Sequence, residues 1–250
     1  MPSLRSVVAG LCLTTCALLS TTSAAAIPPK VECSKSPALP LTGGKSFFQS
    51  QYKSLRLYIL TFQPAAAVEL PATTLELAYV LVGRGIQNYT CASAGATPVA
   101  IGAVANLYDA TSIARLSATS LHALAPKAVY LPTPKQGASF LGVPYIGHHF
   151  FDSAGTPVFT LDAQKGPTKS IAYVKKSANV AAPAKSDKGP AKTGAVDWLF
   201  LEAKTDAAYA GKSVGVKQVY RVVTSGGVGG ACTVAGVKSV EYAAEYWLYK

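Results

Sequence analysis

Short segments in which apolar and polar residues alternate recur along the chain from residue 55 to the C-terminus. Side chains of a strand point alternately to its two faces, so this alternation predicts half-buried β-strands. Glycine, proline and serine separate the segments, as is typical of tight turns. The predicted strands cover residues 55–60, 75–82, 86–91, 99–108, 140–151, 157–161, 170–175, 198–203, 216–224 and 239–249.

Many short strands at regular spacing are typical of an all-β fold, here a mainly antiparallel β-sandwich or barrel with one or two short helices. Gly83 and Gly85 interrupt the apolar run, so we expect 86–91 to return as the second arm of a hairpin. One helix is predicted over 110–124, where leucines at helical spacing share a face.

The first 26 residues have the pattern of a secretory signal peptide. Arg5 precedes an uncharged stretch with a short apolar core, which ends in small residues before Pro28. Threonines interrupt this core, and it is shorter than the ~20 apolar residues of a membrane-spanning helix. We therefore expect a cleaved export signal over 1–26, a secreted mature protein and no transmembrane anchor.

The rest of the chain is expected to form an irregular N-terminal arm and one domain. Residues 27–54 are rich in Pro, Ser and Gly and predict the arm, and residues 55–250 predict a single β-rich domain. Residues 178–194, rich in Ala, Pro, Lys and Gly, predict a flexible loop of that domain. The alternative, a linker between two domains, leaves too few strands on its C-terminal side to close a core.

The charge balance bears on the class of partner. The chain has 23 Lys+Arg against 12 Asp+Glu, a net charge of +11, yet only 14% of its residues are charged and half are apolar. This composition excludes a disordered basic tail. The lysines are scattered without aromatic-flanked clusters, so nucleic acid is not an expected partner. An anionic polysaccharide, a host protein or a small apolar ligand suits a basic exported protein better.

Three cysteines remain once the signal is removed, and an oxidising compartment allows them one disulfide and one thiol. We predict a bridge between Cys91 and Cys232, with Cys33 as the competing partner. Asn88 begins an N-x-Thr glycosylation sequon directly before Cys91. A glycan at Asn88 requires this side chain to face solvent.

Several stretches taken together resemble one protein family. They are 82–91 (VGRGIQNYTC), 98–109 (PVAIGAVANLYD), 147–151 (GHHFF), 155–159 (GTPVF), 194–199 (GAVDWL), 219–222 (VYRV) and 242–247 (YAAEYW). Their order and spacing over residues 70–250 resemble the secreted fungal proteins of Domain of Unknown Function 3455, a family that also has bacterial members. The resemblance implies a fungal extracellular protein and brings no established chemistry with it.

Fungal members of this family are often labelled malate dehydrogenase, and the residues argue against that activity. A dinucleotide fold needs Gly-x-Gly-x-x-Gly between a strand and a helix, so that backbone amides approach the pyrophosphate. The nearest string, 226–230, lies between two predicted strands, and Cys232 stands in place of the final glycine. We therefore predict no nicotinamide cofactor, and no other cofactor is predicted.

The adjacent histidines His148 and His149 are the most conspicuous candidates for chemistry. Together with Asp152 they are candidate catalytic residues, or ligands to a metal such as zinc or copper. Neighbouring residues of a strand point to opposite faces, so only one histidine faces a given site unless Gly147 makes a turn. The plainer interpretation, which we favour, is one buried, hydrogen-bonded histidine beside a phenylalanine and one exposed histidine.

The other ligand-binding candidates are aromatic, acidic or basic residues of the predicted strands and turns: Arg84, Asp197, Trp198, Arg221, Glu245 and Trp247. Either acidic residue with its neighbouring tryptophan would line an aromatic surface on which a sugar or another ligand ring stacks. Packing of these aromatic residues in the core is the favoured alternative, since aromatics are common in strands. Each arginine is expected to pair with a buried carboxylate or to bind an anionic ligand.

These observations favour a secreted, non-catalytic binding or interaction protein at a cell wall, host or small-ligand surface. The alternative is a small secreted enzyme, either metal-assisted through His148 or His149 or a cofactor-free catalyst that rearranges a ligand in a β-barrel cavity. An enzyme predicts a deep pocket where a histidine, a carboxylate and aromatics converge. A binding protein predicts a shallow aromatic or basic patch.

Overall fold

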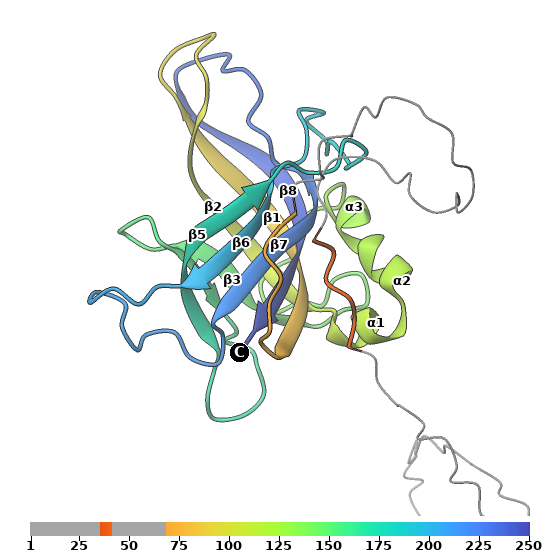
Figure 1. The fold of residues 1–250 in the computed structure, drawn as a ribbon. Coiled ribbons are helices and arrows are strands. Elements are labelled where there is room, and N and C mark those ends of the chain that lie inside the picture. The colour runs from red at the N-terminus through yellow and green to blue at the C-terminus, as the bar shows by residue number, and fades with distance from the viewer. Residues whose placement is uncertain (1–35, 42–68) are drawn as a thin grey trace, which may run out of the picture. The chain divides into compact units, whose positions relative to one another are not determined.

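Eight antiparallel strands form a closed barrel in the computed structural model, which describes residues 36–41 and 69–250 (Figure 1). Each strand pairs with the next along the chain, and the last strand closes the barrel on the first. The strands are β1 (Leu77–Cys91), β2 (Val99–Asp109), β3 (Tyr145–Phe151), β4 (Pro157–Thr160), β5 (Ile171–Val180), β6 (Trp198–Ala203), β7 (Gln218–Gly226) and β8 (Gly236–Tyr249). The predicted all-β, antiparallel class is confirmed, and the architecture is a barrel.

Strand β8 shows how the sequence builds both faces of the barrel wall. Tyr242, Tyr246 and Leu248 belong to the apolar cluster inside the barrel, whereas Trp247 and Tyr249 belong to a second cluster on its outer face. This division follows from the alternation of side chains along a strand. From Tyr242 to Tyr249 both faces of β8 are buried, because the interior packs on one face and the helices cover part of the other.

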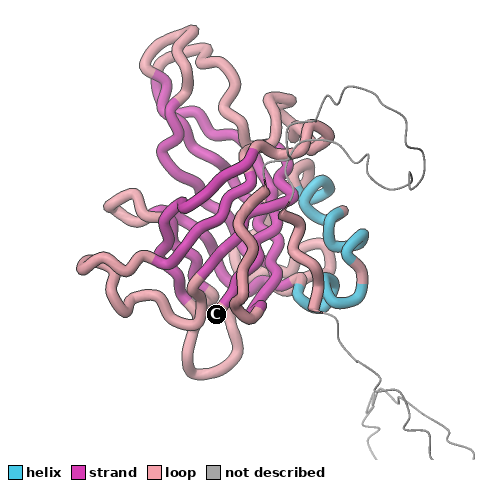
Figure 2. Tube along the Cα trace, viewed as in Figure 1, coloured by secondary structure: helices cyan, strands magenta, loops and turns pink. Residues whose placement is uncertain are grey.

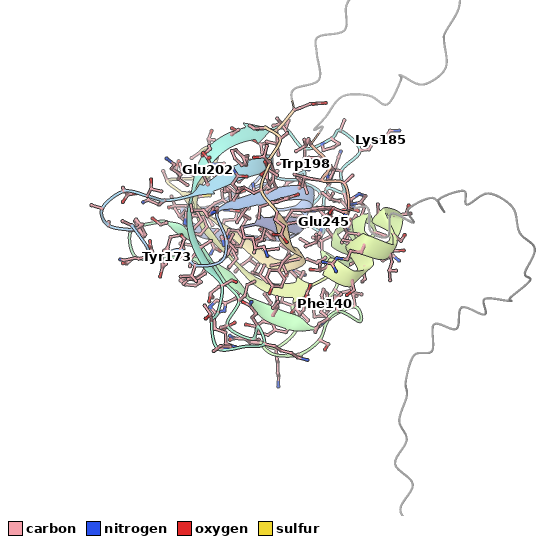
Figure 3. The ribbon with its side chains drawn as sticks, turned by 60° about the horizontal axis from the view of Figure 1, so that its bottom comes forward. Phe140, Tyr173, Lys185, Trp198, Glu202 and Glu245 are labelled. Atoms are coloured by element: carbon pink, nitrogen blue, oxygen red, sulfur yellow. A yellow bond between two sulfur atoms is a disulfide. The ribbon has the colours of Figure 1, made fainter. Side chains whose placement is uncertain are left out.

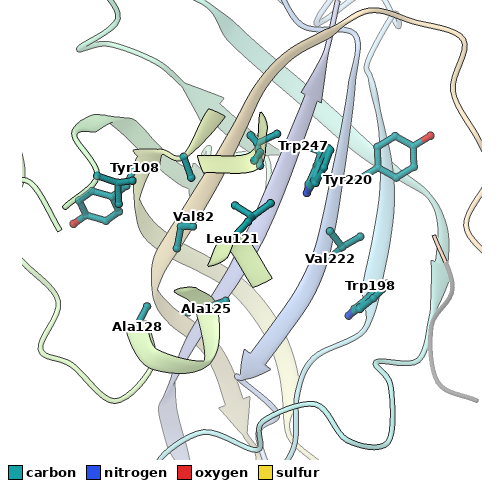
Figure 4. Close-up of a cluster of buried hydrophobic side chains, with 14 of the residues drawn as sticks. Val82, Tyr108, Leu121, Ala125, Ala128, Trp198, Tyr220, Val222 and Trp247 are labelled. Atoms are coloured by element: carbon teal, nitrogen blue, oxygen red, sulfur yellow. The ribbon is translucent and has the colours of Figure 1, made fainter. Parts of the chain in front are cut away.

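Three short helices lie against the outer face of β1, β7 and β8 within the described residues (Figure 2). They are α1 (Thr111–Leu116), α2 (Ala118–His122) and α3 (Leu124–Ala128). Leu121 and Ala125 of these helices join Val82, Val222 and Trp247 of the strands in one buried cluster (Figure 4). The helices therefore remove one side of the barrel wall from water, which stabilises the fold through apolar burial.

Ser117 divides the single helix that the sequence predicted over 110–124. Its backbone is extended, with φ −157° and ψ 108°, and its side-chain oxygen accepts a hydrogen bond from the Ser120 backbone N–H. Serine favours such helix starts because its short side chain satisfies an N–H group that has no partner in the first turn. The prediction of helical structure here was right in place and wrong in continuity.

Strand β1 continues through Gly83 and Gly85, where the sequence predicted a hairpin turn. Neither glycine has a positive φ. A side chain at residue 83 would collide with the Tyr246 ring, and one at residue 85 would collide with the backbone of Val104. The hairpin prediction was wrong because glycine marks a close approach of neighbouring groups as well as a turn.

The connection between β5 and β6 differs from the loop predicted over 178–194. Strand β5 extends to Val180, so the first residues of that range belong to the strand. Further along, the Asp187 carboxylate accepts hydrogen bonds from the Tyr130 hydroxyl at 2.7 Å and from the Gly189 N–H, and its backbone oxygen accepts from the Gly226 N–H. These bonds tie the middle of the connection to the end of β7 and to the segment after α3.

The predicted disulfide between Cys91 and Cys232 is confirmed. Cys91 ends β1, and Cys232 lies in the connection that leads into β8, the strand that pairs with β1. The competing partner Cys33 lies outside the described residues, as do the predicted signal peptide, most of the predicted arm and the strand predicted over 55–60.

Candidate ligand-binding cavity

A cavity of about 450 Å³ occupies one end of the barrel interior. Tyr89 and Phe151, near the ends of β1 and β3, line it together with Pro157 and Leu199, near the starts of β4 and β6. At the other end of the barrel the interior is filled, and Leu81 of β1 packs there in the interior apolar cluster. The barrel is thus solid at one end and hollow at the other.

The lining of the cavity is mostly apolar or aromatic, with a small polar set. The polar side chains that line it are Gln87, His149, Lys176, Asp197 and Arg221. Gln87 lies on β1, His149 on β3, Lys176 on β5 and Arg221 on β7, and Asp197 directly precedes β6. The closure of the barrel brings these five residues together. A mostly apolar pocket with a few converging polar groups is the usual form of a small-molecule site.

With Lys176, Arg221 is one of the two cationic side chains among the described residues that line the cavity. Its Nε and Nη2 donate hydrogen bonds to the backbone oxygen of Asp197, at 3.2 and 2.9 Å. The Asp197 carboxylate accepts a hydrogen bond from Asn179 Nδ2 at 2.9 Å. In the part of the chain that the structure describes, Arg221 makes no ion pair with a carboxylate.

Two tyrosines stand close to this charge inside the barrel. Tyr242 and Tyr246 are buried, and their hydroxyl oxygens are 3.0 Å apart. Burial raises the pKa of both phenols, and the positive charge of Arg221 opposes that rise. Both hydroxyls therefore stay protonated at neutral pH, and Tyr246 presents a neutral phenol at the cavity wall.

His149 is the buried histidine of the adjacent pair. Its Nδ1 donates a hydrogen bond to the Val158 backbone oxygen at 2.8 Å, and its ring stacks on Phe159 with centroids 4.2 Å apart. Burial lowers its pKa to about 4, against the opposing effect of the Val158 hydrogen bond. The ring is therefore neutral at physiological pH. With Nδ1 as the donor, Nε2 is an acceptor that has no hydrogen-bond partner among the described residues.

His148 and Asp152 do not join His149 in a site. His148 faces the other side of β3, where its Nδ1 lies 3.4 Å from the Asp162 carboxylate and its ring stacks on Phe150. Asp152 accepts hydrogen bonds from the Tyr209 hydroxyl and from backbone N–H groups of the turn after β3. Across residues 36–41 and 69–250, no group of three or more His, Cys, Asp or Glu side chains is placed to hold a metal ion.

Arg84 lies on the outer face of the wall and not in the cavity. Its Nε and Nη2 donate to the Leu131 backbone oxygen at 3.1 and 2.8 Å, and its guanidinium pairs with Glu241. Desolvation lowers the pKa of this arginine. Arg84 thus pairs with a carboxylate, but Glu241 is half exposed and not the buried carboxylate expected from the sequence. The bonds to Leu131 fasten the segment after α3 to β1.

Three of the other candidates, Glu245, Trp247 and Trp198, lie on the outer face of the wall and not in the cavity. Glu245, fully buried, accepts hydrogen bonds from His122 Nδ1 at 2.8 Å and from Trp247 Nε1 at 3.0 Å (Figure 3). Trp198 packs in the same outer cluster, and its Nε1 has no hydrogen-bond partner among the residues that the structure describes. The aromatic surface predicted around Asp197 and Glu245 is therefore split between two sides of the wall.

Asn88 lies on β1 between β2 and β8. Its side chain is half-buried, and its Oδ1 accepts a hydrogen bond from the Ser239 hydroxyl at 2.7 Å. The glycan at Asn88 stays a prediction; it would be joined to Nδ2, a different atom from the Oδ1 that accepts this hydrogen bond.

Residues 71–250 match the family described as "Protein of unknown function (DUF3455)". The chain belongs to the DUF3455 family. Comparison with curated proteins and with solved structures finds no match. None of the helices in the described residues of this DUF3455 protein is long and apolar enough to cross a membrane.

The glycine-rich string 226–230 of this DUF3455 chain forms part of the connection between the antiparallel strands β7 and β8. It begins at the end of β7 and leads toward β8. A side chain at Gly227 would meet Tyr242 and Val196, and the Gly227 oxygen accepts a hydrogen bond from the Tyr89 hydroxyl at 2.6 Å. The glycines therefore allow a close approach of the connection to the barrel, which is a different use from holding a pyrophosphate.

Sequence reasoning missed Gln87 and Lys176 as cavity residues of this DUF3455 protein, and it gave His122 no role beside Glu245. The alternation on β1 placed Gln87 on one face of the strand. It did not show that this face points into a hollow barrel, because that depends on how the strands close.

Proposed function

We propose that this protein is a secreted binding protein whose barrel cavity takes up a small, mainly apolar ligand. The observation that carries the proposal is the hollow end of the barrel, where apolar and aromatic side chains surround about 450 Å³. Of the three partner classes predicted from the sequence, this geometry favours the small apolar ligand. The proposed binding site is a cavity that opens at one end of the barrel, in place of the shallow patch that the sequence led us to expect.

The size of the cavity suits a small organic molecule. Its volume of about 450 Å³ falls within the roughly 300–1,000 Å³ that is typical of small-molecule pockets. At roughly 30 Å³ per non-hydrogen atom, the share of a water molecule in the liquid, it accommodates about 15 such atoms. Transfer of an apolar ligand from water to walls such as Phe159 and Leu201 is favourable by roughly 25 cal/mol per Å² of apolar surface.

Binding is better supported than catalysis, although a histidine, a carboxylate residue and aromatics do converge here as the enzyme alternative predicted. An efficient general base has a pKa near the working pH, whereas the pKa of His149 is lowered to about 4. The Asp197 carboxylate is engaged by Asn179. His149 Nε2 therefore serves better as a fixed hydrogen-bond acceptor for a ligand than as a proton shuttle.

Export is supported by the signal-type pattern of residues 1–26 and agrees with the disulfide, because disulfides persist in oxidising compartments. Expression of the full chain in a eukaryotic host, followed by N-terminal sequencing of protein from the medium, tests this part. A new N-terminus after one of the residues Ala24, Ala25 or Ala26 is the expected result. Retention of the intact N-terminus inside the cell would contradict export.

The cavity itself is tested with the neutral fluorophore N-phenyl-1-naphthylamine. We expect its fluorescence to rise on binding and to fall when decanol displaces it. Ala100 is exposed and lines the cavity, so Ala100→Trp should obstruct the entrance and weaken binding about tenfold or more, as expected for lost ligand burial. Val104 is half exposed and is not a lining residue, which makes Val104→Trp the matched control. Equal binding by both variants would refute the cavity as the site.

A further inference from the structure

We propose that the ligand of this cavity carries a carboxylate, held by Arg221 with Lys176 at the entrance, on an otherwise apolar body. This inference rests on the proposed function and names the chemical class of its ligand. It follows from the charge of the lining and from the hydrogen-bond donors that the protein leaves unused.

Arg221 keeps donor capacity directed to the cavity. Its Nε and Nη2 each donate to the Asp197 backbone oxygen, and a side-chain hydrogen bond joins the guanidinium to Tyr246. A guanidinium has five N–H donors, so these three bonds leave two for a ligand. A backbone oxygen satisfies donors but does not neutralise the charge. Guanidinium groups form their strongest hydrogen bonds with carboxylates, often through two parallel N–H donors.

The rest of the lining adds positive charge. Lys176 lines the cavity, is exposed, and forms no ion pair within residues 36–41 and 69–250. The only lining carboxylate in that part of the chain belongs to Asp197, and it accepts a hydrogen bond from Asn179. Two cations against one anion leave the lining with a net positive charge.

The cost of desolvation selects an anionic ligand over a neutral one. A ligand that fills the cavity displaces water from the Arg221 guanidinium. A wholly apolar molecule offers the guanidinium no hydrogen-bond acceptor in place of that water, and this is unfavourable for a charged group. A carboxylate supplies both charge and acceptors, so the displaced water is compensated.

The exposure of the lining residues indicates how such a ligand is oriented in the cavity. Lys176 is exposed and marks the entrance, whereas Phe159 and Leu201 are buried, at 1% and 4% exposure. The carboxylate therefore lies toward Arg221 and Lys176, and the apolar body lies against the buried side chains. His149 offers an acceptor to a hydroxyl elsewhere on the ligand.

Calorimetric titration with three probes of one chain length tests the inference: decanoate, decanol and decylammonium. We expect decanoate to bind about tenfold or more tightly than decanol, the factor that a hydrogen bond to a charged group supplies. Decylammonium should bind more weakly than either. Equal binding of decanoate and decanol would overturn the carboxylate but leave the cavity function standing. Binding of none of the three would overturn both.

Variants assign the preference to particular residues. Arg221→Gln should reduce the preference for decanoate over decanol about tenfold, and Arg221→Lys should retain most of it. Arg115, exposed at the end of α1 and outside the cavity, provides the control Arg115→Gln, which should keep the full preference. Lys176→Gln should also reduce this preference, and because Lys176 is exposed the substitution leaves the packing of the barrel interior unchanged. Full preference in both Arg221→Gln and Lys176→Gln would refute the assignment.

Discussion

Removal of the His122 imidazole should destabilise the protein in a pH-dependent manner. His122 donates from Nδ1 to the fully buried Glu245 carboxylate at 2.8 Å, and the other hydrogen-bond partner of that carboxylate among the described residues is Trp247 Nε1 at 3.0 Å. His122→Ala leaves a buried carboxylate short of a partner, which costs about 1–3 kcal/mol. We place the loss toward the lower end, because the His122 side chain is 35% exposed and water can reach the gap.

The pKa of His122 sets the sign of the pH dependence. The hydrogen bond to Glu245 raises this pKa above its ordinary 6.5, against the opposing effect of desolvation. A folded pKa above the unfolded one gives stabilisation that is fully present below pH 6.5 and is lost as pH rises through the folded pKa. The cost of His122→Ala should therefore be larger at about pH 5.5 than at about pH 9.

Urea unfolding followed by tryptophan fluorescence measures this difference, because Trp247 and Trp198 lie in the cluster next to the pair. His122→Asn is the control, since its amide donates a hydrogen bond at every pH and carries no charge. Its cost should change less with pH than that of His122→Ala. A cost of His122→Ala that is equal at both pH values, or greater at pH 9, would refute the reasoning.

Two further predictions concern stability. Cys91→Ser with Cys232→Ser removes a bridge across a sequence separation of 141 and should lower the free energy of unfolding by about 2–5 kcal/mol; an unchanged Tm would contradict this. The pKa of His149 is about 4 in the folded protein against an ordinary 6.5, so between these pH values the folded state binds fewer protons than the unfolded state. The protein should therefore lose stability as the pH falls from 6.5 to about 4. His149→Phe should flatten the dependence of unfolding free energy on pH there, as measured by urea titrations.

The predicted strands came close to the observed ones wherever alternation was clear. Residues 198–203 were predicted as a strand, and β6 covers the same residues. The same local signal predicted helical structure near 110–124 but missed the division at Ser117, which depends on one hydrogen bond from the Ser120 N–H. The ends of helices depend on individual hydrogen bonds of this kind, and hydrophobic periodicity does not reveal them.

Glycine was the least reliable local signal. Gly83 and Gly85 looked like a turn, and they are instead positions where the Tyr246 ring and the Val104 backbone leave no room for a side chain. Both neighbours are distant in sequence, so no local pattern distinguishes the two uses of glycine.

By itself, the sequence predicted the all-β class, favoured the Cys91–Cys232 bridge over a pairing with Cys33, and indicated opposite directions for His148 and His149. The fold class follows from short alternating segments at regular spacing, and the histidine directions follow from the two-residue period of a strand. The number of cysteines allowed one bridge, and the structure decided which two form it. Only the tertiary structure decided which face of each strand is the inside. Closure of β8 on β1 sends Arg221 and His149 into a cavity and sends Glu245 and Trp247 under the helices. Alternation assigns the residues of a strand to two faces. The pairing of strands that are distant in sequence decides which of those faces lines the cavity.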